Sequence, residues 1–129
     1  MTVMKNIISA ALISMFVVFA VSAKAGPLED SVAAYEREDY VTAVKLFRLS
    51  ADQGDAWAQN WLGVMYENGQ GVTQDYVRAH MWWNISASSG HNNAESNRDI
   101  VAKKVSQTQI EKAQEMARRC QSSNFKNCD

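Results

Sequence analysis

An internal repeat of 36 residues is the feature that most constrains how this chain can fold. Aligning residues 39–58 with residues 75–94 gives eight identities in twenty positions, where chance would give about one. The identical pairs are Asp39/Asp75, Tyr40/Tyr76, Val41/Val77, Ala43/Ala79, Ser50/Ser86, Ala51/Ala87, Gly54/Gly90 and Ala58/Ala94. A period in the thirties is typical of stacked helix pairs, because a single pair cannot bury its apolar face alone.

Both copies carry the signals of a helix with defined ends. Four apolar residues in each copy recur at intervals of three or four, which places them on one helix face. They are Tyr40, Ala43, Phe47 and Ala51 in the first copy and Tyr76, Ala79, Trp83 and Ala87 in the second. Asp39 and Asp75 precede these helices, where a carboxylate accepts backbone N–H groups of the first turn. Gly54 and Gly90 follow them, where a positive φ closes a helix.

The segment between the two copies predicts a further helix. In residues 56–67, Ala58, Leu62 and Tyr66 recur at intervals of four on one face. The stretch Asn68-Gly69-Gln70-Gly71 then ends this helix. Pro27, the sole proline of the chain, suits the first position of a helix that precedes the repeat. No run of alternating apolar and polar residues indicates a strand.

The chain beyond Gly90 predicts two more helices. Ala94, Ile100 and Val101 indicate the first of them. Ser106-Gln107-Thr108-Gln109 has the form of a capping box and therefore marks the start of the second. The expected apolar face of that last helix is formed by Ile110, Ala113, Ala117 and Cys120.

These residues together closely resemble the Sel1-like repeat, a relative of the tetratricopeptide repeat, in a protein of the small exported bacterial type. The matching run is Ala58-x-x-x-Leu62-Gly63-x-x-Tyr66-x-x-Gly69-x-Gly71-Val72-x-x-Asp75-Tyr76-x-x-Ala79-x-x-x-Trp83-x-x-x-Ala87-x-x-Gly90-x-x-x-Ala94. The resemblance implies an all-α fold, a right-handed α-solenoid of about two and a half antiparallel helix pairs. The expected repeat domain spans residues 26–120, in units of about 28–54, 55–90 and 91–120. Such repeats commonly act as adaptors for protein contacts, without cofactors and without enzymatic activity.

The same resemblance suggests where a partner protein or peptide binds. In the tetratricopeptide repeat the first helix of each pair lines the concave face. Placing the motif on residues 56–68 predicts an inner row of five residues: Trp57, Asn60, Val64, Glu67 and Asn68. Trp57 is the strongest candidate, because indole rings dominate interface energies. The alternative is that Trp57 or Trp61 packs against a neighbouring unit, and Trp83 is expected in the core, with Trp82 at a seam between repeats.

The first 25 residues predict a secretory signal. A short basic start is followed by an apolar run from Ile7 to Val21 and by small residues at Ala23 and Ala25. Cleavage after Ala25 would deliver the chain to the periplasm or the cell exterior, with no stable membrane insertion. The alternative is an uncleaved anchor helix, for which the apolar run is short.

An exported setting is also oxidising, and the two cysteines of the chain, Cys120 and Cys128, then invite a disulfide. The alternative is that Cys120 is a small buried apolar residue at a helix end. Residues 121–129 are expected to form a polar tail that is tied down only if the cysteines pair.

Charge and motif content narrow the class of function. Removing Lys5 and Lys24 with the signal leaves 11 basic residues against 14 acidic ones, a balance of −3. Nucleic-acid binding needs a basic stripe, which this sequence lacks. His80 and His91, the only histidines, have no partners at metal-ligand spacing, so we expect no metal site. A cell-wall (peptidoglycan) hydrolase, or a regulator of one, is the alternative function, with Glu67 as its one candidate acid. Open repeat ends also suggest a homodimer.

Overall fold

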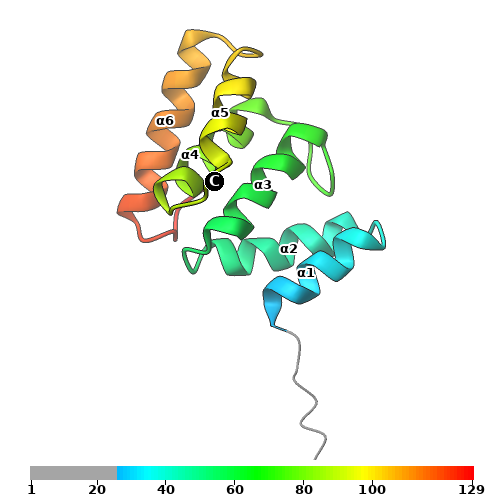
Figure 1. Ribbon diagram of the computed structural model, residues 1–129. Coiled ribbons are helices and arrows are strands. Elements are labelled where there is room, and N and C mark those ends of the chain that lie inside the picture. The colour runs from blue at the N-terminus through cyan, green and yellow to red at the C-terminus, as the bar shows by residue number, and fades with distance from the viewer. Residues whose placement is uncertain (1–25) are drawn as a thin grey trace, which may run out of the picture.

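The computed structural model describes residues 26–129, so the predicted signal segment lies outside the described residues (Figure 1). The described part contains helices and no strands, which confirms the all-α prediction. Its helices are α1 (Pro27–Glu36), α2 (Tyr40–Ala51), α3 (Ala56–Asn68), α4 (Tyr76–Ser88), α5 (Ala94–Ala102) and α6 (Gln107–Ser122). No helix among residues 26–129 has the length and apolar character needed to cross a bilayer.

The helices from α1 to α5 pack as a continuous stack in chain order, and α6 packs back on α4. Contacts join α1 to α2, α2 to α3 and α3 to α4, and α4 then contacts both α5 and α6. In Figure 1 the pair α1 and α2 lies at one end of the molecule, and α5 and α6 lie at the other. This is an all-α helical solenoid, in which α3 and α4 form the central layer.

Local capping explains where the helices begin. Asp39, Asp55 and Asp75 each accept a hydrogen bond from the backbone N–H three residues later, which satisfies a donor that the helix itself leaves unpaired. Ser106 and Gln109 form both hydrogen bonds of the predicted capping box at the start of α6. The repeated aspartates are thus confirmed as helix caps.

The loop between α3 and α4 is fixed against α2 by a glycine. Gly71 has a φ of +71°, and a Cβ atom at this position would overlap the backbone carbonyl of Tyr40. A residue with a side chain would therefore be strained and would also push the loop away from α2. The predicted positive φ is confirmed as well at Gly54 and Gly90, with φ values of +88° and +100°.

The core lies between the helix pairs and is rich in aromatic residues. Its largest members with almost no exposed surface are Phe47, Leu62, Met65, Met81, Trp82, Trp83 and Ile85. Trp83 therefore occupies the core, as predicted, and Tyr40 and Tyr76 pack against the core while partly exposed. The helix indicated by Ala94, Ile100 and Val101 is confirmed as α5, and the Ile100 side chain is 52% exposed. Because α5 is short and buries only Ala94 and Val101, Ile100 falls on its outer side.

The segment after α6 is more ordered than its polar composition predicts. It turns back at Asn124 and Phe125, which both have positive φ, and the ring of Phe125 lies beside Gly54. Cys128 is buried and pairs with Cys120 of α6 as a disulfide, with 4.3 Å between their Cα atoms. The chain thus returns from α6 toward α2 and α3.

Candidate partner-binding site

The five residues predicted to bind a partner lie along one side of α3, and we call them the α3 row. The row consists of Trp57, Asn60, Val64, Glu67 and Asn68. Their spacing of three or four residues places them on one helix face. The structure gives the row an aromatic end at Trp57 and a polar end at Glu67 and Asn68.

The aromatic end is held by rings from the first helix pair. The Trp57 ring lies 5.5 Å from Trp61 and 6.2 Å from Phe47, measured between centroids. Trp61 is stacked on Phe47 at 5.6 Å and lies 4.7 Å from Tyr35 of α1. Trp61 therefore packs against the neighbouring unit, whereas Trp57 makes contact on one side and remains 37% exposed. Trp57 is a partly exposed indole whose position is fixed by its neighbours.

Two polar members of the row contact α5 and the turn that follows it. The Asn60 side-chain oxygen accepts a hydrogen bond from Asn97 of α5 at 3.1 Å. Glu67 accepts one from Lys104 at 2.9 Å, and the Lys104 ammonium also lies 5.3 Å from the Tyr76 ring centroid. This hydrogen bond raises the pKa of Lys104 above its usual range. Lys104 and Glu67 therefore form an ion pair beside the Tyr76 ring.

Val64 and Asn68 complete the row with different roles. Val64 is half-buried and packs on the core. Asn68 is exposed and donates a hydrogen bond to Gln70 at 3.4 Å, and Gln70 in turn donates to the Tyr35 hydroxyl at 3.1 Å. The loop after α3 is thereby connected to α1, so both ends of the row are joined to the first helix pair.

The two histidines of the chain make structural contacts. His80 is only 3% exposed, and burial, followed by the nearby charge of Arg98, lowers its pKa. His91 accepts a hydrogen bond from the backbone of Asn93 through Nδ1. Within residues 26–129, no three His, Cys, Asp or Glu side chains gather closely enough to hold a metal ion. His80 is a neutral core residue of α4 at pH 7.

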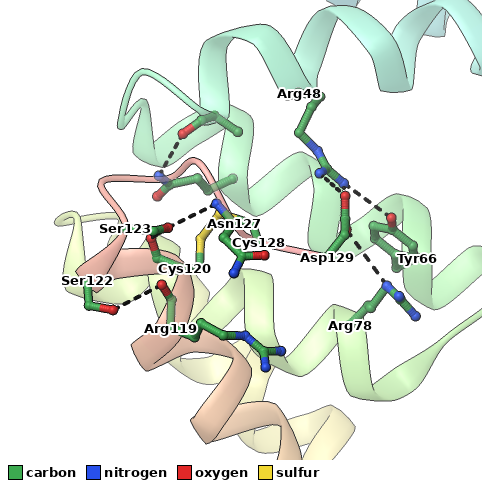
Figure 2. The surroundings of a disulfide bond; sticks show 12 residues. Arg48, Tyr66, Arg78, Arg119, Cys120, Ser122, Ser123, Asn127, Cys128 and Asp129 are labelled. Carbon is green, nitrogen blue, oxygen red and sulfur yellow. Dashed lines mark hydrogen bonds and ion pairs between the residues drawn. A yellow bond between two sulfur atoms is a disulfide. The ribbon is translucent and has the colours of Figure 1, made fainter.

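Sequence reasoning missed one cluster of charged residues, which lies beside the disulfide (Figure 2). Arg48, Tyr66 and Arg78 come from α2, α3 and α4 and surround the carboxylate of Asp129. The only hint in the sequence is an acid placed directly after Cys128. Nothing in the repeat pattern marks Arg48, because it is separated from Asp129 by 81 residues.

The fold defines the class of this protein as a helical solenoid of repeated helix pairs. The model of the Sel1 repeat family matches residues 33–55 and 58–91, which cover the end of α1, all of α2 and α4, and all but the start of α3. The chain is a Sel1-like repeat protein. Sel1 repeats generally mediate protein–protein contacts and are not typically enzymatic. Comparison with curated proteins and with solved structures gave no match.

Proposed function

We propose that this chain is an exported interaction module that binds a partner protein or peptide on the α3 row. The observation that carries the proposal is Trp57, whose ring is anchored by Trp61 and Phe47 and yet stays 37% exposed. A rigid exposed indole buries a large apolar area on binding and loses little conformational entropy. It is therefore the expected anchor of the interface.

The polar members of the row support the same proposal. Asn60 and Glu67 are already oriented by Asn97 and Lys104. A partner that hydrogen-bonds to these groups does not need to order them first, which lowers the entropic cost of binding. The row thus combines an apolar anchor with fixed polar groups, as protein interfaces do.

The binding proposal is tested by comparing variants of the row with a matched exposed residue elsewhere. Purified wild type, Trp57→Ala and Ile100→Ala are cross-linked in envelope extract, and the captured proteins are quantified. Ile100 is the control, because it is 52% exposed on α5 and outside the row. We expect Trp57→Ala to lose about tenfold or more of the captured partner and Ile100→Ala to retain it. Equal capture by all three proteins would contradict the proposal.

Export is a separate part of the proposal, supported by the signal pattern of residues 1–25. The test is the mass of the protein recovered from the cell envelope fraction. We expect a chain that begins at Gly26. A full-length chain that sediments with membranes would support the anchor helix instead.

An assay of peptidoglycan cleavage distinguishes the hydrolase alternative from the binding proposal. Glu67 forms an ion pair with Lys104 at 2.9 Å, so the carboxylate of this candidate acid has a basic partner. We expect no release of soluble peptidoglycan fragments by the wild type. Release that disappears in Glu67→Gln would favour a hydrolase.

Self-association has a candidate surface on α2. Val41 and Leu49 are 57% and 54% exposed and lie eight residues apart, so they share one side of this helix. A second copy would cover them. Sedimentation at increasing concentration tests this, with Leu49→Lys expected to weaken any dimer; a monomer at all concentrations would remove the idea.

A further inference from the structure

Three successive helices each contribute one side chain to a site around the carboxylate of Asp129. Arg48 of α2 pairs with both carboxylate oxygens, through Nη1 to Oδ2 and through Nη2 to Oδ1. Arg78 of α4 places Nε 3.8 Å from Oδ1. The Tyr66 hydroxyl of α3 accepts a hydrogen bond from Arg48 at 3.3 Å. Figure 2 shows the three side chains pointing toward Asp129.

Arg48 is held in place before any anion arrives. Its guanidinium lies 4.9 Å from the ring centroid of Trp82, a fully buried residue, and its side chain is only 22% exposed. Stacking on an indole fixes the plane of the guanidinium. A guanidinium that is fixed and largely desolvated needs an anion with two acceptor oxygens, which a carboxylate supplies.

The surroundings of Asp129 are hollow and are lined by both basic and acidic side chains. Two adjoining hollows of about 390 and 430 Å³ are both lined by Asp75, Arg78 and Asp129. The first is also lined by Lys112, Arg119 and Glu115. Asp75 is already neutralised by Arg78, whose Nη1 lies 2.7 Å from it. If the carboxylate of Asp129 withdrew, Arg48 would therefore lose its only ion pair within residues 26–129.

A short covalent tether delivers Asp129 to this site. The preceding residue, Cys128, is bonded to Cys120 of α6, and the backbone N–H of Asn127 donates to the Ser123 hydroxyl at 2.9 Å. Tethering gives Asp129 a high effective concentration at the arginines without further contacts. Even so, the Asp129 side chain stays 52% exposed, so a competitor can reach the same groups from solvent.

We propose that Arg48, Tyr66 and Arg78 form a second binding site that takes an acidic side chain of a protein partner, and that Asp129 occupies it until the partner displaces it. A peptide is the expected ligand, because the group in place is an aspartate on a non-helical peptide segment and the hollows are open. This site is separate from the α3 row. Tyr66 lies two residues from Val64 and therefore on nearly the opposite side of α3.

The test measures binding of a fluorescein-labelled, end-capped peptide, Gly-Asn-Asp-Asp-Asn-Gly, to the oxidised protein. Asp129→Asn removes the internal competitor and keeps the disulfide. We expect this variant to bind the peptide about tenfold or more tightly than the wild type, because its site is no longer occupied. The same peptide with Asn in place of Asp should not bind.

Further variants test whether Arg48 and Arg78 bind the peptide. In the Asp129→Asn background, Arg78→Gln and, separately, Arg48→Gln should abolish binding, and Arg118→Gln, an exposed arginine outside the site, should leave it unchanged. Arg78 is 37% exposed, so its variant is expected to fold even if loss of Arg48 disturbs the core. The proposal is overturned if Asp129→Asn binds no better than wild type, or if neither arginine variant weakens binding.

A competition experiment distinguishes a peptide ligand from a small free acid. Succinate at the same concentration as the peptide should not displace it, because the peptide also contacts the hollows on either side of the carboxylate. Complete displacement by succinate would overturn the assignment to a protein partner. Because no residue of the α3 row is changed in these proteins, this result is independent of the outcome for Trp57.

Discussion

The indole ring of Trp83 lies directly against the backbone of Gly63. A Cβ atom at position 63 would stand 2.6 Å from the indole Nε1 and 2.7 Å from Cε2. Trp83 is only 2% exposed, so the ring has no room to retreat. The Leu-Gly pair of the repeat motif is thereby explained: α3 and α4 approach so closely that α3 has no side chain at this point.

Gly63→Ala is therefore expected to destabilise the protein by about 1–3 kcal/mol, the usual cost of overpacking a core. This overlap must outweigh the gain of about 1 kcal/mol that alanine brings to a helix interior. In a Trp83→Phe background, the smaller ring removes the overlap, and the same change should become neutral or stabilising. Urea unfolding of the four proteins measures the coupling. Equal losses in both backgrounds would show that Trp83 is not the cause.

Reduction of the disulfide is expected to lower the free energy of unfolding by about 2–3 kcal/mol, since the bond closes only a short loop. Cys120→Ser with Cys128→Ser should reproduce this loss, and reducing agent should then have no further effect. Thermal melting with and without reductant is the measurement, together with titration of free thiols. Two reactive thiols in the untreated protein would contradict the pairing.

The stability of this protein is expected to fall as the pH is lowered through the ordinary histidine range, because of His80. The unfolded chain binds a proton with the usual histidine pKa of 6.5, whereas burial lowers the pKa of His80 in the folded protein. The unfolded state therefore takes up more protons, and unfolding becomes easier as pH falls from about 7.5 to about 5.5. Arg98 strengthens this effect and Asp99 opposes it.

Urea unfolding at both pH values checks the role of His80. The variant His80→Gln should lose most of the pH dependence, and His91→Gln should keep it. If His91→Gln flattened the profile instead, the assignment to His80 would be wrong.

Asp75 is expected to stabilise the protein at neutral pH and to stop doing so in acid. Burial alone would raise its pKa, but hydrogen bonds from the backbone and guanidinium of Arg78 outweigh burial and hold it below 3.8. The lowered pKa of Asp75 adds stability that is present above pH 3.8. This stability is lost as the pH falls through the pKa that Asp75 has in the folded protein.

Two variants separate the capping role of Asp75 from its charge. Asp75→Ala should cost about 1–2 kcal/mol at pH 7, because α4 loses its cap. Asp75→Asn should retain the helix cap but lose the part of the stability that disappears in acid. Asp39 is the matched position one repeat earlier. Asp39→Ala should cost less, because the only ion pair of Asp39 within residues 26–129 is an exposed contact with Arg37 at 3.9 Å. Equal losses at both positions would contradict the contribution of Arg78.

The sequence alone determined the helices, their caps and the repeat. These features depend on signals that are local or periodic, such as Asp75 before α4, the Ser106 capping box and the positive φ of Gly90. Even the burial of Trp83 followed from its place in the repeat. The sequence did not show which side of α5 is buried, because packing against α4 decides that side and the spacing within α5 does not.

Only the tertiary structure decided which groups meet across the stack. Asn60 and Glu67 were placed on one side of α3 by their spacing, but their partners Asn97 and Lys104 each lie 37 residues away. Arg48 and Asp129 are 81 residues apart and belong to no common motif. Helix spacing fixes which side of one helix a residue occupies, whereas contacts between helices depend on how the whole chain packs, and no local pattern records that packing.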